Sequence, residues 1–173
     1  MADQAHTQTA GPRRPPFGGP EADRPKYYTF GYAGHMPGDL TPFLSETGAF
    51  VADVRLVPNS TMPAWQGPAL KARWADRYVH VRELGNQAYK EPGAEFAIVD
   101  LEAGIARLLR APGPVVIMCG CGALATCHRR IIAEALQALG HEVPEILAQE
   151  TGEPLHPPAR ILAPAARQLS MFD

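Results

Sequence analysis

The sequence has few cysteines, almost no net charge and no long apolar run, and each of these scarcities excludes a class of protein. Its 16 Lys and Arg nearly balance its 18 Asp and Glu, so no overall basic field concentrates nucleic acid non-specifically. No stretch approaches the roughly 18 apolar residues of a membrane span. The opening MADQAHTQTA lacks the apolar core of a signal peptide. We therefore expect a cytoplasmic protein without membrane contact.

The three cysteines are gathered in one short segment. Cys119, Cys121 and Cys127 lie within nine positions of one another, whereas a secreted disulfide scaffold spreads an even number of cysteines along its chain. This pattern favours a reducing compartment. A chain of 173 residues has the size of one domain and can bury a sufficient core without disulfides.

Composition divides the chain into three parts. Residues 1–25 are rich in Gly, Pro and charge with few apolar residues, so ordering them would cost more entropy than burial returns. We predict a disordered arm there, an α/β domain over residues 26–148, and a Pro-rich tail over residues 149–173 that ends in QLSMFD.

Strands and helices are predicted to alternate within the central part. Apolar and aromatic runs predict strands at residues 27–32, 49–55, 77–84 and 115–119, with a weaker fifth at 141–147. Helical periodicity predicts helices at residues 40–46, 68–75, 94–110 and 127–140. Such alternation implies parallel pairing with right-handed crossovers. We predict one Rossmann-like, doubly wound, mainly parallel sheet of about five strands with helices on both faces.

Polar side chains follow the predicted strands, at the edge where such sheets bind ligands. The predicted ligand-binding residues are Tyr32, Gly34, Arg55, Ser60, Glu83, Asn86 and Arg129. The alternative is that Asp53 and Arg55 form a structural ion pair and that Tyr32 belongs to the core.

The thiol-rich segment ends a buried strand and is the main candidate site. A thiolate at Cys119 would face a Gly-rich turn and a helix N-terminus, whose amide dipoles stabilise negative charge. Either His128 or Arg129 would lower the pKa of that thiol further. The predicted catalytic residues are Cys119, Cys127, His128 and Asp53. The spacing does not match phosphatase and sulfurtransferase loops, in which five residues separate a cysteine from an arginine.

Two other interpretations of the same segment stay open. Cys119, Cys121, Cys127 and His128 are suitable zinc ligands, although the irregular spacing argues against a structural knuckle, so no cofactor is assumed. The cysteines are alternatively small buried hydrophobes. The backbone amides at the start of the last helix, with Arg55, would clamp a phosphate or carboxylate, which predicts an anionic small molecule or nucleic acid as ligand.

Four segments together resemble a known family. YTFGYAGH, VADVRLVPNS, YVHVRELGN and VVIMCGCGALATCHRR are similar to the prokaryotic family called domain of unknown function four-eight-eight, over roughly residues 27–146. The matching positions are residues 28–32, 53–55, 84–85 and 127–129, with Pro58, Ser60 and Cys119. Many members carry an acidic residue where this chain has Cys121. The resemblance supports the fold and the strand-end site but implies no particular reaction.

The last residues resemble a docking peptide. Gln168, Leu169, Ser170, Met171 and Phe172 are similar to the peptide by which bacterial DNA polymerases and repair enzymes bind the sliding clamp, with Met171 in place of Leu. Such peptides are extended anchors whose apolar side chains fill a preformed pocket. The resemblance implies a sliding clamp as partner, and the alternative is a tail that packs on its own domain.

Two functional hypotheses follow from the sequence. The first is an enzyme with a thiol-lined anionic crevice that acts on a nucleotide or DNA base in replication or repair. The second is a non-catalytic module in which the same crevice holds a nucleotide or a zinc ion.

Overall fold

Four apolar segments form one parallel sheet in residues 26–146, the part of the chain that the computed structural model describes. The strands are β1 (Tyr27–Gly31), β2 (Phe50–Asp53), β3 (Tyr78–His80) and β4 (Val115–Cys119). Their order in the sheet is β1-β4-β2-β3, and every pairing is parallel. Because β4 lies between β1 and β2, Cys119 ends an inner strand that is buried along its whole length.

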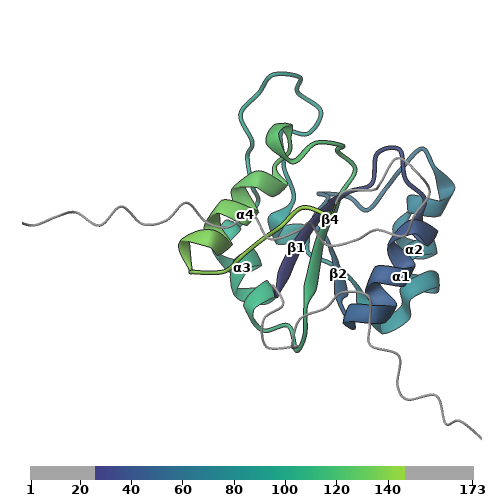
Figure 1. The fold of residues 1–173 in the computed structure, drawn as a ribbon. Coiled ribbons are helices and arrows are strands. Elements are labelled where there is room, and N and C mark those ends of the chain that lie inside the picture. Colours follow the sequence, from purple (N-terminus) through teal and green to yellow (C-terminus); the bar gives the residue numbers. More distant parts are fainter. Residues whose placement is uncertain (1–25, 147–173) are drawn as a thin grey trace, which may run out of the picture.

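Four α-helices cover the two faces of the sheet (Figure 1). They are α1 (Pro37–Thr47), α2 (Gly67–Trp74), α3 (Leu101–Leu109) and α4 (Arg129–Ala138). Helices α1 and α2 pack with Tyr28, Phe30 and Met118 on one face, and α3 and α4 pack with Ile117 and Cys119 on the other. The predicted α/β fold with a parallel sheet and helices on both faces is confirmed.

Two helices begin well away from their predicted starts, whereas α2 and α4 begin within two residues of theirs. The helix predicted at residues 94–110 begins only at Leu101, because the Asp100 carboxylate accepts a hydrogen bond from the backbone N–H of Ala103 at 2.9 Å and caps the helix there. The helix predicted at residues 40–46 begins earlier, at Pro37, whose fixed φ suits a first helical turn. Because α3 begins at Leu101, residues 94–100 belong to the long loop that precedes it.

The predicted fifth strand is reduced to a single bridge. Within the described residues, segment 141–146 pairs with β1 only at Thr29 and Glu145, where the Thr29 N–H donates to the Pro144 carbonyl at 2.9 Å. Pro144 has no N–H to continue a ladder, so five full strands are not formed. The third strand is also shorter than predicted, since residues 82–84 turn into a 3₁₀ helix.

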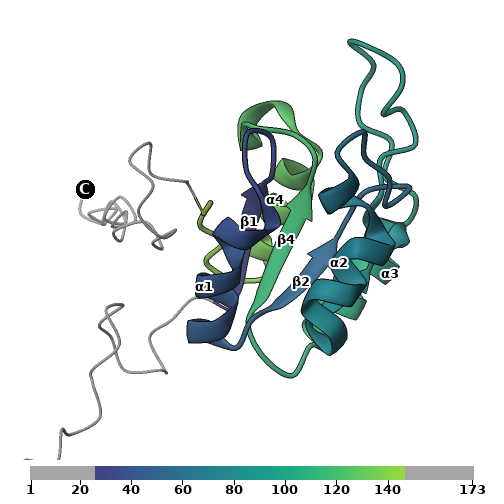
Figure 2. The same cartoon turned by 90° about the vertical axis from the view of Figure 1, so that its right-hand side faces the viewer.

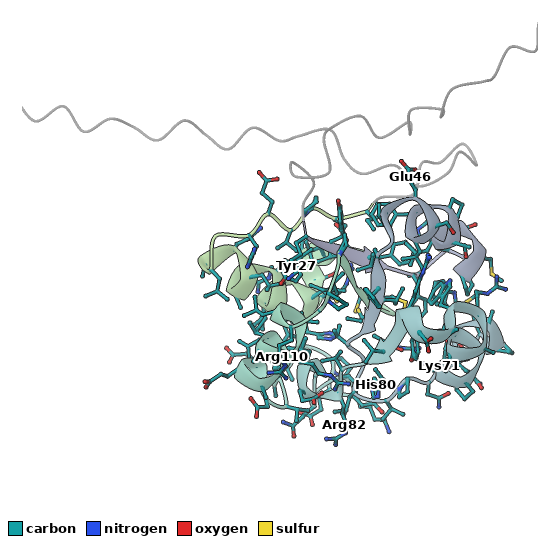
Figure 3. The ribbon with its side chains drawn as sticks, turned by 90° about the horizontal axis from the view of Figure 1, so that it is seen from below. Tyr27, Glu46, Lys71, His80, Arg82 and Arg110 are labelled. Carbon is teal, nitrogen blue, oxygen red and sulfur yellow. The ribbon has the colours of Figure 1, made fainter. Side chains whose placement is uncertain are left out.

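All four strands point the same way, and a long loop rises above their carboxyl ends. Figure 2 shows the strands running upward and the teal loop of residues 86–98 projecting beyond them. In Figure 3, which looks from below, Glu46 of α1 and Arg82 after β3 lie at opposite margins of the fold. Among the described helices, none combines the length and apolar character that a bilayer crossing requires. The predicted arm and the clamp-binding peptide lie outside the described residues.

Candidate functional site

A pocket of about 430 Å³ lies at the carboxyl ends of the strands. Its wall combines residues that follow β1, β2 and β4 with the long loop before α3. The lining residues are Tyr32, Arg55, Leu56, Val57, Asn59, Asn86, Ala88, Tyr89, Glu91, Gly93, Ala94, Phe96, Cys119, Gly120, Cys121, Thr126 and His128. A cavity of this size suits a small organic ligand.

Three thiols and one imidazole converge beside the pocket, and Cys119, Cys121 and His128 line its wall. The ligand atoms of Cys119, Cys121, Cys127 and His128 all lie within 4.8 Å of one another. This group is close enough to hold one metal ion. Cys119, Cys127 and His128 are buried, whereas Cys121 is partly exposed. The group comes together because β4 ends at Cys119 and the following loop returns to start α4 immediately after His128.

The hydrogen bonds of His128 show that its Nε2 carries a proton and that its Nδ1 faces the thiols. Its Nε2 lies 2.9 Å from the backbone carbonyl oxygen of Val54, and because a carbonyl only accepts, Nε2 must donate. Its Nδ1 lies 3.8 Å from the Cys127 Sγ and faces the thiols. A histidine held by a carbonyl through one nitrogen, with the other directed at a potential ion, has the arrangement seen around protein-bound metals.

The two inner thiols differ in their acidity. The Cys119 and Cys127 Sγ atoms are 3.0 Å apart. Hydrogen bonds to Cys121 and Cys127, together with burial, raise the pKa of Cys119. Hydrogen bonding by Cys119 lowers the pKa of Cys127, with further help from the Arg129 backbone N–H at 3.4 Å and side-chain Nε at 3.3 Å. Cys127 is therefore the thiolate of the pair, and Cys119 donates to it.

His128 takes the opposite charge when no ion is bound. Burial lowers the pKa of its imidazole, but hydrogen bonding to Cys121 and Cys127 outweighs this and raises the pKa to about 9. The charge on Cys127 is thereby balanced from two sides, by His128 and by the buried guanidinium of Arg129. A bound cation would replace the imidazole proton, because a ligating histidine is neutral.

Arg129 supports the thiol loop from behind. The residue is fully buried, and its Nη2 donates to the Gly122 carbonyl at 3.1 Å and contacts the Glu145 carboxylate at 3.4 Å. Its Nη1 is buried and has no hydrogen-bond partner in the described part of the chain. Gly31 is needed opposite it, since a Cβ there would collide with the Cys121 and Gly122 carbonyl oxygens. Arg129 does not line the pocket.

Asp53 and Arg55 form a buried ion pair beside the pocket. The Arg55 Nε lies 2.8 Å from one Asp53 carboxylate oxygen and Nη2 lies 2.5 Å from the other. The Tyr78 hydroxyl donates to Asp53 at 2.8 Å. Burial opposes the charge on Arg55, but its hydrogen bond with Asp53 and the charge of that carboxylate raise its pKa. Asp53 is fully buried and does not line the pocket, so it acts here as a counter-ion.

The remaining donors of Arg55 are also directed at the protein. Its Nη1 donates to the Tyr32 hydroxyl at 3.0 Å and to the backbone carbonyls of Asn59 at 3.0 Å and Trp65 at 2.9 Å. The Tyr32 ring stacks on Trp65 with centroids 4.3 Å apart. Arg55 therefore joins the loop after β2 to the end of β1 and fixes one wall of the pocket.

The structure brings together only some of the residues predicted from strand ends. Tyr32, Arg55, Asn86, Cys119, Cys121 and His128 line the pocket. Glu83 instead pairs with Arg107 of α3 at 3.0 Å, and the Ser60 hydroxyl accepts a hydrogen bond from the Met62 backbone N–H at 3.1 Å. Gly34 adopts a left-handed turn with φ of 84° and lies outside the lining, as do Asp53, Cys127 and Arg129.

Sequence reasoning missed the loop that forms the far wall. Ala88, Tyr89, Glu91, Gly93, Ala94 and Phe96 line the pocket but follow no strand directly. The Phe96 ring also contacts His128 edge-on, with centroids 6.5 Å apart. The available signal was Asp100, a good N-cap residue directly before LEAGIARLL. If Asp100 is taken as the start of the helix, the connection between the third strand and that helix becomes unusually long. Long connections of this kind are typical of functional loops.

Comparisons with protein-family models, curated proteins and solved structures found no match. The resemblance of the sequence to a known family therefore stays a prediction.

Proposed function

We propose that this protein is an enzyme that binds a nucleotide or a nucleic-acid-linked substrate in the pocket and activates it with the Cys119, Cys121, Cys127 and His128 group. The observation that carries the proposal is that three of these four residues, Cys119, Cys121 and His128, line the wall of a pocket of about 430 Å³. The proposal treats the sheet as Rossmann-like, and such sheets bind ligands beyond the carboxyl ends of their strands.

We further propose that the group holds zinc. Thiolate and imidazole are the ligands that zinc prefers, and the four ligand atoms are already gathered within 4.8 Å. The Cys121 backbone N–H donates to the Cys119 Sγ at 3.3 Å, and the Val54 carbonyl fixes the His128 ring. These supporting hydrogen bonds orient ligands before an ion arrives.

Cys121 decides whether such a site is closed or reactive. Four protein ligands make a closed structural site, whereas catalytic zinc keeps one position for water or substrate. Cys121 is the partly exposed member of the group and lies in the pocket wall. Exchange of this ligand would place the substrate next to an ion that polarises carbonyl groups and activates water.

A second candidate is catalysis by a thiolate without metal. It is favoured by the two hydrogen bonds from Arg129 to the Cys127 Sγ at 3.3 and 3.4 Å, because such donors stabilise a thiolate. In this case Cys119, which reaches the pocket, attacks as the nucleophile and passes its proton to the Cys127 thiolate 3.0 Å away. A non-catalytic zinc-binding module is the remaining alternative, and it differs by showing metal without turnover.

Metal analysis of full-length protein purified without chelators tests the zinc proposal. One zinc per chain is expected, with loss of the metal in Cys127→Ser and in His128→Gln. His141→Gln is the matched control, because His141 packs against Tyr27 and is not in the group, so it should keep its zinc. Metal-free protein with a rapidly alkylated Cys119 would overturn the zinc proposal and favour the thiolate.

We also propose that the protein works in a reducing cytoplasm and takes part in DNA replication or repair. The close pair of free thiols supports the first. The second depends on Gln168, Leu169, Met171 and Phe172, which lie outside the described residues. Deleting residues 168–173 should abolish binding to a purified sliding clamp, and unchanged affinity would contradict this part.

A further inference from the structure

The loop of residues 86–98 is closed at its base by one asparagine side chain. The Asn86 Oδ1 accepts hydrogen bonds from the backbone N–H of Ala88 at 3.2 Å and of Ala97 at 2.8 Å. Asn86 also forms an antiparallel bridge with Ile98, and the Gln87 N–H donates to the Ala97 carbonyl at 2.7 Å. The orientation of the amide is therefore set by the fold.

The other half of this amide faces the pocket. Because Oδ1 receives two N–H groups, the opposite atom is Nδ2, a donor. Asn86 is only 7% exposed and lines the pocket. Its Nδ2 makes no hydrogen bond to the part of the protein that the structure describes. Because Nδ2 is also not one of the fully buried atoms without a partner, it is accessible from the pocket. The small exposed part of Asn86 is thus a fixed N–H donor at the pocket surface.

The charged groups in the pocket wall are poorly suited to phosphate. The charge of Arg55 is neutralised by Asp53. Its Nη1 donates to the backbone carbonyl oxygens of Asn59 and Trp65. His128 uses Nε2 on Val54 and turns Nδ1 to the thiols. Glu91 adds negative charge to the loop side. Among the described lining residues, none offers an unengaged cationic side chain, so Arg55 does not supply the cationic part of the anion clamp expected from the sequence.

Aromatic rings line two walls of the pocket. Tyr32 follows β1 and is stacked on Trp65 with Arg55 over its ring, so Tyr89 and Phe96 of the far-wall loop are the rings left to contact a ligand. Flat rings favour stacking or edge contacts with other planar groups, and base-binding sites in proteins combine such contacts with hydrogen bonds to the base edge. Rings with one fixed amide donor favour a planar ligand that carries a hydrogen-bond acceptor.

We propose that the pocket recognises a neutral planar heterocycle of the nucleobase type, and that Asn86 Nδ2 donates to a carbonyl oxygen or ring nitrogen of that base. This inference deepens the proposed function and rests on it, since it names the part of the substrate that the pocket holds. The Asn86 amide faces the same cavity as the thiol group, so the bound base lies between the loop and the strand ends.

Titration calorimetry with the full-length, metal-containing protein tests the inference. The probes are cytidine, uridine, adenosine and guanosine, single-stranded oligonucleotides of the same bases, and inorganic phosphate. Binding of at least one nucleoside or oligonucleotide is expected, with no binding of phosphate. Tighter binding of the oligonucleotide would identify an unpaired base in a strand as the natural ligand. Binding of phosphate alone, or of none of the probes, would overturn the inference.

The variant Asn86→Asp isolates the donor. A carboxylate still accepts from the Ala88 and Ala97 N–H groups but has no N–H to offer, so base affinity should fall at least tenfold. Asn59→Asp is the matched control, because Asn59 also lines the pocket and its Oδ1 accepts from the Ser60 N–H. The control should change affinity less than threefold. Equal losses in both variants would show a charge effect and contradict the assignment.

A measurement on the unmodified protein covers the case in which Asn86→Asp fails to fold. The side-chain NH₂ resonances of Asn86 should shift on addition of the bound nucleoside, and those of Asn59 should shift less. An unchanged Asn86 signal at saturation would contradict the inference. Zinc content and turnover are recorded on the same samples. Nucleoside binding without chemical conversion of the nucleoside would contradict the enzyme proposal but not the present inference. Conversion of the nucleoside at the same rate in Asn86→Asp would contradict the present inference but not the enzyme proposal.

Discussion

The Sγ atoms of Cys119 and Cys127 lie 3.0 Å apart, as two free cysteines of which one donates to the other. A disulfide has an S–S bond of about 2.05 Å, so a modest movement would join them. Both thiols belong to the group that is close enough to hold a metal ion. Metal binding and oxidation therefore compete for the same atoms.

Removing any bound metal should make this pair the preferred site of oxidation. When chelator-treated protein is exposed to diamide, the reagent takes up two electrons and two protons and Cys119 becomes linked to Cys127. Cys121 should stay available to an alkylating reagent, because it is partly exposed and Cys119 already contacts Cys127. Peptide mapping by mass spectrometry checks the linkage. Cys121→Ser should give the same disulfide, and a dominant Cys119 to Cys121 linkage would contradict the geometry.

Substituting Asp53 should damage the fold rather than the chemistry. Asp53→Ala leaves the buried charge of Arg55 without its partner, and breaking such a pair costs about 3–5 kcal/mol of unfolding free energy. Urea unfolding measures the loss. Asp76→Ala is the control, since Asp76 is fully exposed and 3.9 Å from Lys71, and it should unfold like the parent. A stable Asp53→Ala protein without activity would instead assign Asp53 to catalysis.

Gly31→Ala should distort the thiol loop. Its new Cβ would collide with the Cys121 and Gly122 carbonyl oxygens and with the Arg129 guanidinium, and overpacking of this kind costs about 1–3 kcal/mol. We expect lower stability in urea together with weaker metal binding. Gly38→Ala is the matched control, because nothing lies near its added Cβ in α1, so its stability should be unchanged or higher. Normal metal binding by Gly31→Ala would show that the loop tolerates displacement.

Tyr78 should make the protein sensitive to alkaline pH. Burial, followed by the negative charge of Asp53, raises the pKa of its hydroxyl. A raised folded-state pKa means that the contribution of Tyr78 to stability is complete below about pH 10, the ordinary tyrosine pKa, and is lost as the pH rises above it. Tyr78→Phe removes this contribution and should show a shallower loss of stability above that pH. Parallel slopes for both proteins in urea unfolding series would contradict the assigned role.

The sequence by itself determined the parallel α/β class and the place of the thiol group. Both depend on local patterns: apolar runs such as residues 115–119 form buried strands, and the helical period after Cys127 places His128 at a helix start. The carboxyl ends of parallel strands share one edge, so the sequence alone places Tyr32, Asn86 and Cys119 near one another.

Only the tertiary structure decided which polar side chains turn toward the pocket. Arg55 was predicted to clamp an anion together with the backbone amides of His128 and Arg129, yet Asp53 binds the Arg55 guanidinium and the Arg129 N–H donates to Cys127. These partners come from different elements, and the cost of burying an unpaired charge selects the pairing. The far wall depends in the same way on Asn86, whose amide binds backbone eleven residues away. Contacts between distant segments leave no periodic signal in a sequence, whereas strands and helices do.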